Sequence, residues 1–230
     1  LFLNNFYSTE STHDSLLLDV FKSSIRYNII SNKDSIIQNL NIGWDSEILS
    51  YKNKLIDTIL TNQSLSLDFS KSEINNSFRL GGNFYPLGYK KNNYEINFLY
   101  ESFILKDKKF KISADLTEFR PVFEINNYQS NHHFWDNKQF NNILFWNASA
   151  EISSGLFSLK SQINQAYRPI YFTEYSEPSQ FDSSLQVIQS SLNYNFIKKK
   201  YNLFTEIVYQ FQGGAQIFQL PDWIGQVKFN

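Results

Sequence analysis

Hydrophobic and polar residues alternate with a period of two along most of this chain. In the run NYEINFLYESFIL, which begins at Asn93, the apolar side chains of Tyr94, Ile96 and Phe98 alternate with polar ones. The run KFKISADLTE, residues 109–118, repeats the pattern. A helix would need apolar residues at i, i+3, i+4 and i+7, and these runs do not supply them. The alternation therefore predicts β-strands with one apolar and one polar face.

The same pattern predicts about eleven strands over the whole chain. Their approximate spans are 16–30, 35–49, 63–70, 76–88, 93–106, 109–121, 141–153, 155–169, 184–197, 201–213 and 220–230. Many of them reach the length of about 10 residues that a tilted strand needs to cross a bilayer.

Short and longer connections between the predicted strands alternate. The short connections are SNKD, KSEIN, KDK, SSG and KKK. The longer ones are SYKNKLIDTILTN (residues 50–62), the medium-length YKKN, the segment around NYQSNHHFWDN, YFTEYSEPSQFD and GGAQIFQ. Antiparallel neighbours place successive connections at opposite rims, and outer-membrane barrels have short turns at the periplasmic rim and long loops at the external one. The sequence thus predicts an all-β protein, an antiparallel transmembrane β-barrel.

The polar face of the predicted strands carries many ionisable side chains. It holds Arg26, Arg79, Glu95, Glu101, Lys109, Lys111, Asp115, Glu151, Lys160, Arg168 and Glu206. Ionised groups in such number would be costly in a dry core unless each were paired. We therefore predict that these residues line a water-filled lumen and that the apolar face contacts lipid. Aromatic residues on the apolar face that could form interfacial girdles are Trp44, Tyr100, Trp146, Tyr167, Tyr194 and Tyr209.

The composition agrees with a sheet that has one apolar and one polar face. Aromatic residues make up 17% of the chain, yet the mean hydropathy is negative. The net charge of −1 gives no field that would attract nucleic acid. The absence of cysteine excludes disulfides, thiolate catalysis and cysteine zinc sites. No window approaches 18 consecutive apolar residues, so no transmembrane helix is expected, and the lack of methionine predicts that the sequence is part of a longer product.

The stretch NYQSNHHFWDN, residues 127–137, concentrates reactive side chains. Ser130, His132, His133 and Asp136 suggest a hydrolase or a metal site. A Ser-His-Asp unit is defined by its geometry in space, however, and no G-x-S-x-G nucleophile turn accompanies it. Adjacent histidines on an extended segment point to opposite sides. We therefore predict no catalytic residue, no metal and no cofactor here, and interpret the stretch as an external loop anchored by Phe134 and Trp135.

This loop and two later segments resemble a known family. The matching elements are S-N-H-x-x-W at residues 130–135, Pro178–Gln180, Tyr209-Gln210 and Leu220-Pro221-Asp222. They are similar, in the same order, to motifs of the putative porin family of outer-membrane β-barrels in Bacteroidota, most clearly over residues 120–225. The loop signature comprises Ser130, Asn131, His132, His133 and Trp135.

The resemblance implies transport or diffusion across the bacterial outer membrane. It also implies a signal peptide and further strands outside this chain, so we expect residues 1–230 to be one segment of a single barrel domain. The leading hypothesis is a porin-like channel for passive passage of small polar solutes, not an enzyme. Its expected partners are outer-membrane lipid and, in an assembly, other outer-membrane subunits, and no nucleic acid. The alternatives are a non-conducting barrel subunit of a larger outer-membrane assembly for transport or secretion, an outer-membrane lipid or peptide hydrolase, and a soluble β-sandwich.

Overall fold

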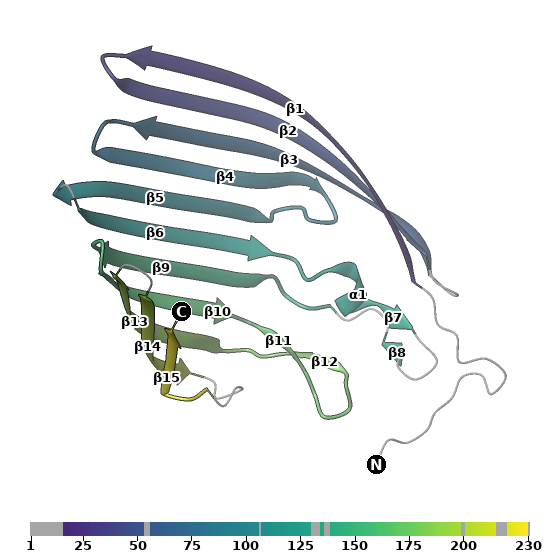
Figure 1. The fold of residues 1–230 in the computed structure, drawn as a ribbon. Coiled ribbons are helices and arrows are strands. Elements are labelled where there is room, and N and C mark those ends of the chain that lie inside the picture. Colours follow the sequence, from purple (N-terminus) through teal and green to yellow (C-terminus); the bar gives the residue numbers. More distant parts are fainter. Residues whose placement is uncertain are drawn as a thin grey trace.

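The main feature of the fold is one large antiparallel sheet. A computed structural model describes residues 16–52, 56–105, 107–129, 134–135, 139–198, 201–214 and 220–229. Eleven strands follow one another in the sheet in chain order (Figure 1). They are β1 (Leu17–Lys33), β2 (Ile36–Lys52), β3 (Asp57–Ser72), β4 (Asn76–Gly88), β5 (Tyr94–Leu105), β6 (Lys108–Phe119), β9 (Ile143–Ser153), β10 (Phe157–Tyr167), β13 (Ser184–Lys198), β14 (Tyr201–Gly214) and β15 (Trp223–Phe229).

The predicted strands are thus confirmed as elements of an all-β fold. The sheet is curved but not closed, because β1 and β15 form its two edges (Figure 1). Closure into a barrel stays a prediction. No helix among the described residues is long and apolar enough to cross a membrane.

The alternation of connections is confirmed, with one correction. The connections 34–35, 73–75, 106–107, 154–156 and 199–200 are each shorter than any of 53–56, 89–93, 120–142, 168–183 and 215–222. The two classes lie at opposite ends of the sheet (Figure 1). The long loop predicted over 50–62 is wrong, because β2 continues to Lys52 and β3 already begins at Asp57. The side chains of residues 50–62 still alternate between the two faces of the sheet. Ile59 is exposed on the apolar face, whereas Tyr51 and Asn62 are buried on the polar face.

Two of the long connections contain structure of their own, which the sequence pattern did not predict. The connection between β6 and β9 holds α1 (Phe123–Asn126) and the small pair β7 (Tyr128–Gln129) and β8 (Phe134–Trp135). The connection between β10 and β13 holds the hairpin of β11 (Ile170–Phe172) and β12 (Pro178–Gln180). All of these elements lie at one end of the sheet (Figure 1).

The sheet has almost no hydrophobic core. Among the described residues, the large hydrophobic side chains that are buried are those of Tyr51 and Trp135. Large apolar side chains are instead exposed along the sheet, from Ile25 on β1, at 75% exposure, to Val227 on β15, at 68%. An apolar surface of this extent needs a cover that the described part of the chain does not supply.

The pairing of β6 with β9 tests the register, because 23 residues of chain separate these neighbours, from Arg120 to Asn142. Ser113 and Ser149 are directly opposite each other, with their Oγ atoms 2.8 Å apart. We expect the double variant Ser113→Cys/Ser149→Cys to form a disulfide under mild oxidation, seen on non-reducing gels. The chain has no other cysteine to compete.

The control for this cross-link is Ser113→Cys/Ala150→Cys, since Ala150 is the next residue of β9 and faces the opposite side of the sheet. A cross-link that forms in the control and not in the first variant would show a register shifted by one residue.

Candidate functional site

One face of the sheet collects the charged side chains of the strands. Residues that are directly opposite in neighbouring strands share a face, and the register joins Arg26 to Glu95 through Gly43, Ser66 and Asn83. The same reasoning, strand by strand, places ten of the predicted lumen residues on this polar face. They are Arg26, Arg79, Glu95, Glu101, Lys109, Lys111, Asp115, Glu151, Lys160 and Glu206. That they line a lumen stays a prediction.

Charges of opposite sign are neighbours across the middle strands. Glu101 is opposite Lys111, Lys111 is opposite Glu151, and Glu151 is opposite Lys160. The Glu101 carboxylate lies 3.8 Å from Lys111 Nζ and 2.9 Å from Lys109 Nζ. Each such cross-strand pair stabilises a sheet by about 0.2–1 kcal/mol. The polar face is therefore densely charged without a large excess of either sign.

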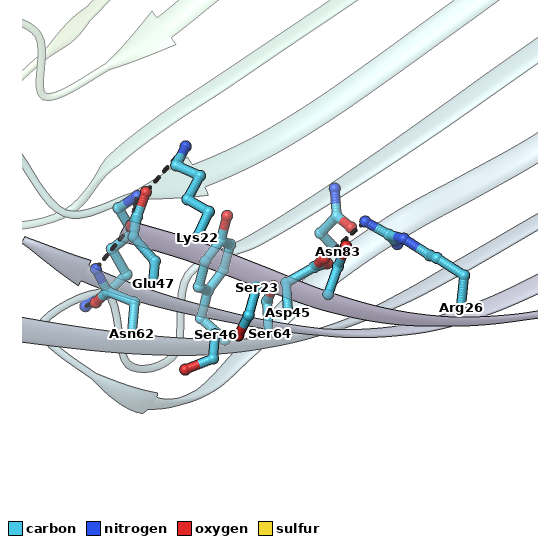
Figure 2. Close-up of a pocket in the computed structure, with 12 residues that line it drawn as sticks. Lys22, Ser23, Arg26, Asp45, Ser46, Glu47, Asn62, Ser64 and Asn83 are labelled. Carbon is cyan, nitrogen blue, oxygen red and sulfur yellow. Dashed lines mark hydrogen bonds and ion pairs between the residues drawn. The ribbon is translucent and has the colours of Figure 1, made fainter. Parts of the chain in front are cut away.

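Glu47 is the centre of the most connected group on this face. Its carboxylate forms ion pairs with Lys90 Nζ at 2.7 Å and with Lys22 Nζ at 3.0 Å. It also accepts a hydrogen bond from Asn62 Nδ2 at 3.0 Å. These residues line an open hollow of about 410 Å³, drawn in Figure 2. The Glu47 side chain is only 13% exposed. The site residues predicted from the sequence do not include Lys22, Glu47, Asn62 or Lys90, although Lys22 and Glu47 occupy polar positions of their strands.

A second ion pair in the same hollow depends on a glycine. Arg26 donates to Asp45 at 2.7 Å and to the Ser66 hydroxyl. To reach Ser66, its side chain crosses β2 at Gly43, where a Cβ atom would overlap both Arg26 and Ser66. Gly43 thus allows an arginine of β1 to lie flat on the sheet and contact β3.

Uncharged side chains form a hydrogen-bonded row across the other half of the polar face. Ser113 bonds Ser149, Gln162 donates to Gln189 at 2.5 Å, and Gln189 donates to Gln210 at 2.8 Å. Gln210 then donates to the carbonyl of Pro221 at 2.7 Å. The family motif residues Gln210 and Pro221 are therefore in direct contact, a link between β14 and the connection that precedes β15.

The connection between β6 and β9 folds over the polar face. Tyr51 lies on this face, opposite Leu18, and its ring packs edge-on against Phe123 of α1 with the centroids 5.0 Å apart. The ring of Phe123 also packs against that of Tyr89, in the turn between β4 and β5, with the ring centroids 6.1 Å apart. Since β2, β4 and β6 are not adjacent strands, α1 bridges positions on the sheet that are separated by intervening strands.

Hydrogen bonds hold α1 in this position. The Tyr89 hydroxyl donates to the carbonyl of Pro121 at 2.9 Å and accepts from Asn126 Nδ2 at 2.8 Å. Burial raises the pKa of Tyr89, so the hydroxyl keeps its proton at neutral pH and remains a donor. The turn between β4 and β5 and the start of the connection after β6 are thus one joined unit.

Of the loop signature, Trp135 lies within the described residues, whereas Ser130, Asn131, His132 and His133 lie outside them. Trp135 is buried, donates from Nε1 to the Glu124 carbonyl at 3.2 Å and stacks on Tyr128 at 4.7 Å. These contacts support an anchoring role for Trp135, while anchoring by Phe134 and the external location of the loop stay predictions. Among the described residues, no group of three or more His, Asp or Glu is placed to hold a metal.

The comparison with protein families decides the family of this chain. A family model described as "Putative porin" matches residues 4–229. The chain belongs to the putative porin family. This confirms the resemblance seen in the loop and strand motifs, while the origin in Bacteroidota stays a prediction. A comparison with curated proteins found no match.

The group around Glu47 gives a stability prediction for this porin-family chain. Glu47→Gln leaves Lys22 and Lys90 without their shared carboxylate, so we expect a loss of about 1–3 kcal/mol in the free energy of unfolding. The loss is measured by urea titration of the refolded protein with tryptophan fluorescence. The control Glu206→Gln removes a carboxylate that faces Asn193 and Gln226. Equal unfolding midpoints for the two variants would contradict this role of Glu47.

The aromatic contacts of α1 give a second prediction for the same chain. Phe123→Ala removes the phenyl ring that packs against Tyr51 and Tyr89. We expect α1 to detach from the sheet more often, which exposes the peptide bond after Glu124 to a glutamyl endopeptidase. We expect cleavage there to be about tenfold faster, which corresponds to about 1.4 kcal/mol of lost packing when opening precedes cleavage. The control is Tyr175→Ala, an aromatic residue of another connection that is 71% exposed. Unchanged cleavage in Phe123→Ala would show that other contacts hold α1.

Proposed function

We propose that this chain forms part of the wall of an outer-membrane channel for passive passage of small polar solutes. The observation that carries the proposal is the single-layered sheet, which exposes apolar side chains on one face and holds paired charges on the other. Membership of the putative porin family supports it.

Lipid is the cover that suits the apolar face. Exposed side chains such as Ile25, Ile59 and Leu67 would remain in water on a soluble sheet, at a cost of about 25 cal/mol for each Å² of apolar surface. In a bilayer the same surface is favourable, and the strand ladders already satisfy the backbone N–H and C=O groups between neighbours. The soluble β-sandwich is the less suitable alternative, because a sandwich needs a second layer on this face.

The aromatic residues on the apolar face fit the membrane proposal in part. Tyr194 lies near the short-turn end of β13, and Tyr167 and Tyr209 lie towards the ends of β10 and β14 that lead into long connections. Positions of this kind suit the two membrane interfaces. Trp44 lies in the middle of β2, so the girdle interpretation suits it least.

Water is the medium that suits the polar face. The charged row from Glu101 to Lys160 and the group around Glu47 are partly exposed, and such groups are far less costly beside water than in a dry interior. Mixed signs on this face support a passage with weak ion selectivity. We propose no catalytic step, because passage along such a wall requires none.

The position of α1 favours a second candidate, a barrel that does not conduct and serves as a subunit of a larger outer-membrane assembly. α1 lies over the polar face and so occupies space that solutes would otherwise use. If the barrel is a non-conducting subunit, the connection that contains α1 blocks the lumen. If it is a channel, the same connection only narrows the entrance.

Planar bilayer recordings with the full-length protein separate the two candidates. Discrete conductance steps with a small reversal potential under a salt gradient are expected for the channel. A protein that inserts, shows the heat-modifiable gel mobility of a closed barrel and carries no current would contradict the channel and support the subunit.

Adjacent residues of β14 test which face contacts lipid. Ile207 lies on the apolar face and is 46% exposed, whereas Val208 lies on the polar face opposite Ser191. Ile207→Arg should cost about 2–4 kcal/mol of folding free energy in lipid vesicles, and Val208→Arg much less, because only the first places a charge in hydrocarbon. The free energies come from reversible refolding in vesicles. A larger loss for Val208→Arg than for Ile207→Arg would reverse the assignment of the faces.

A further inference from the structure

A second hollow lies at the end of the sheet that carries the long connections. It has a volume of about 840 Å³ and is bounded by the turn between β4 and β5, the connection that contains α1, and Arg168 after β10. Both hollows are lined by the turn between β4 and β5, since Tyr89 and Lys91 line this one and Lys90 lines the hollow around Glu47. A solute that approached the polar face from this end would meet it first.

Amide side chains dominate the lining of this hollow. Six Asn and Gln residues contribute to it, together with the rings of Tyr89, Phe123 and Phe140. An amide offers two donors and an acceptor, which suits the adjacent hydroxyl groups of a sugar. Aromatic rings offer apolar surface against which the C–H face of a sugar ring can pack.

The charges of the lining are mostly positive. Lys91, Arg120 and Arg168 contribute cations, and Glu118 contributes the carboxylate among the described lining residues. Glu118 already accepts a hydrogen bond from Asn142 Nδ2 at 3.3 Å. The Arg120 guanidinium lies 4.4 Å from the centroid of the Tyr89 ring and donates from Nη1 to the Tyr89 carbonyl at 3.4 Å, and these contacts hold it beside the hollow.

Two polar atoms of this lining are buried without a hydrogen-bond partner among the described residues. Asn126 is 6% exposed and donates from Nδ2 to Tyr89, but within the described part of the chain its Oδ1 has no hydrogen bond. Arg168 Nε is likewise buried and has no hydrogen-bond partner among the described residues. A buried polar atom without a hydrogen bond costs about 1–3 kcal/mol, so a ligand that offers a hydroxyl to Asn126 and an anionic oxygen to Arg168 would recover that free energy.

The position of Arg168 is built by the surrounding chain. Its backbone has a φ of 58°, a conformation that is uncommon for a residue other than glycine. Gln180 holds it there, because Gln180 Nε2 donates both to the Arg168 carbonyl at 3.0 Å and to the Asn141 carbonyl at 2.8 Å. Gln180 belongs to the family motif Pro178–Gln180, so a motif residue fixes Arg168 beside the amide-rich connection.

We propose that this hollow binds an acidic saccharide, a sugar that carries a carboxylate. Arg168 and Arg120 bind the carboxylate, since guanidinium groups match carboxylate geometry. Asn126 and the neighbouring amides bind ring hydroxyls. The inference rests on the proposed channel, for which the site would select which solutes enter.

The experiment uses the full-length protein and three probes: trigalacturonate, the neutral trisaccharide maltotriose, and acetate. Binding is measured in detergent by calorimetry, and block of single-channel current is measured in planar bilayers with the probe on each side in turn. We expect trigalacturonate to bind and to interrupt the current from one side, and maltotriose and acetate to bind at least about tenfold more weakly because each lacks one of the two interactions.

Two variants test the residues. Arg168→Gln and, separately, Lys91→Gln at an exposed turn position should each weaken trigalacturonate binding, Arg168→Gln by about tenfold or more. Lys71→Gln, the same change of charge at the short-turn end of β3 and on the opposite face, should bind as the unchanged protein does. Heat-modifiable gel mobility shows whether each variant is folded. If Arg168→Gln does not fold, the trigalacturonate affinity of Lys91→Gln tests the site in its place.

The failures of the two proposals are distinguishable. Conductance without binding or block by trigalacturonate would overturn the saccharide site and leave the channel. Binding in detergent without any conductance would overturn the channel and leave the site. Equal binding of maltotriose, or equal binding of acetate, would overturn the acidic saccharide as the ligand, since it would reduce the site to a neutral-sugar or a simple anion site.

Discussion

The alternation of side chains across a single layer of strands is the constraint on which this structure depends. A sheet with no second layer cannot bury its apolar face against itself. The large hydrophobic side chains that are buried among the described residues lie elsewhere, Tyr51 on the polar face and Trp135 in the connection between β6 and β9. The free energy that hydrophobic burial usually provides must then come from the surroundings of the apolar face. Strand pairing satisfies the backbone, and the surrounding medium decides whether the sheet is stable.

The same constraint explains the chemistry of the polar face. Because its side chains are only partly buried, long charged residues are tolerated there, and neighbouring strands pair them. Gly43 shows how closely the sheet accommodates these pairs, since Arg26 crosses the strand at the position where no Cβ exists. The connection that holds α1 covers part of this face through Phe123 and Tyr89. The second hollow therefore occurs where this connection returns to the polar face, whereas strands β1 to β4 and Lys90 line the hollow around Glu47.

Prediction from the sequence was reliable where alternation alone decides the structure. It located all eleven strands of the sheet and assigned ten charged strand residues to one shared face, as the register has them. It was wrong over residues 50–62, where polar residues such as Asn62 resemble a loop but face a hydrogen-bonded group around Glu47. It also missed α1 and the hairpin of β11 and β12, because elements this short leave no period to detect. Arg168 was predicted to lie on the polar face of a strand over residues 155–169. It lies instead just beyond the end of β10, among the amide side chains that line the second hollow.

The sequence by itself determined the class of fold, the order and faces of the strands, and the order of short and long connections. All of these follow from local patterns, since a period of two and the length of a turn are visible in one stretch of chain. Only the tertiary structure decided which charges are partners, that Gln180 fixes Arg168, and that α1 lies on Tyr51. Those contacts join residues far apart in the chain, and their geometry depends on register and curvature, which no single stretch contains.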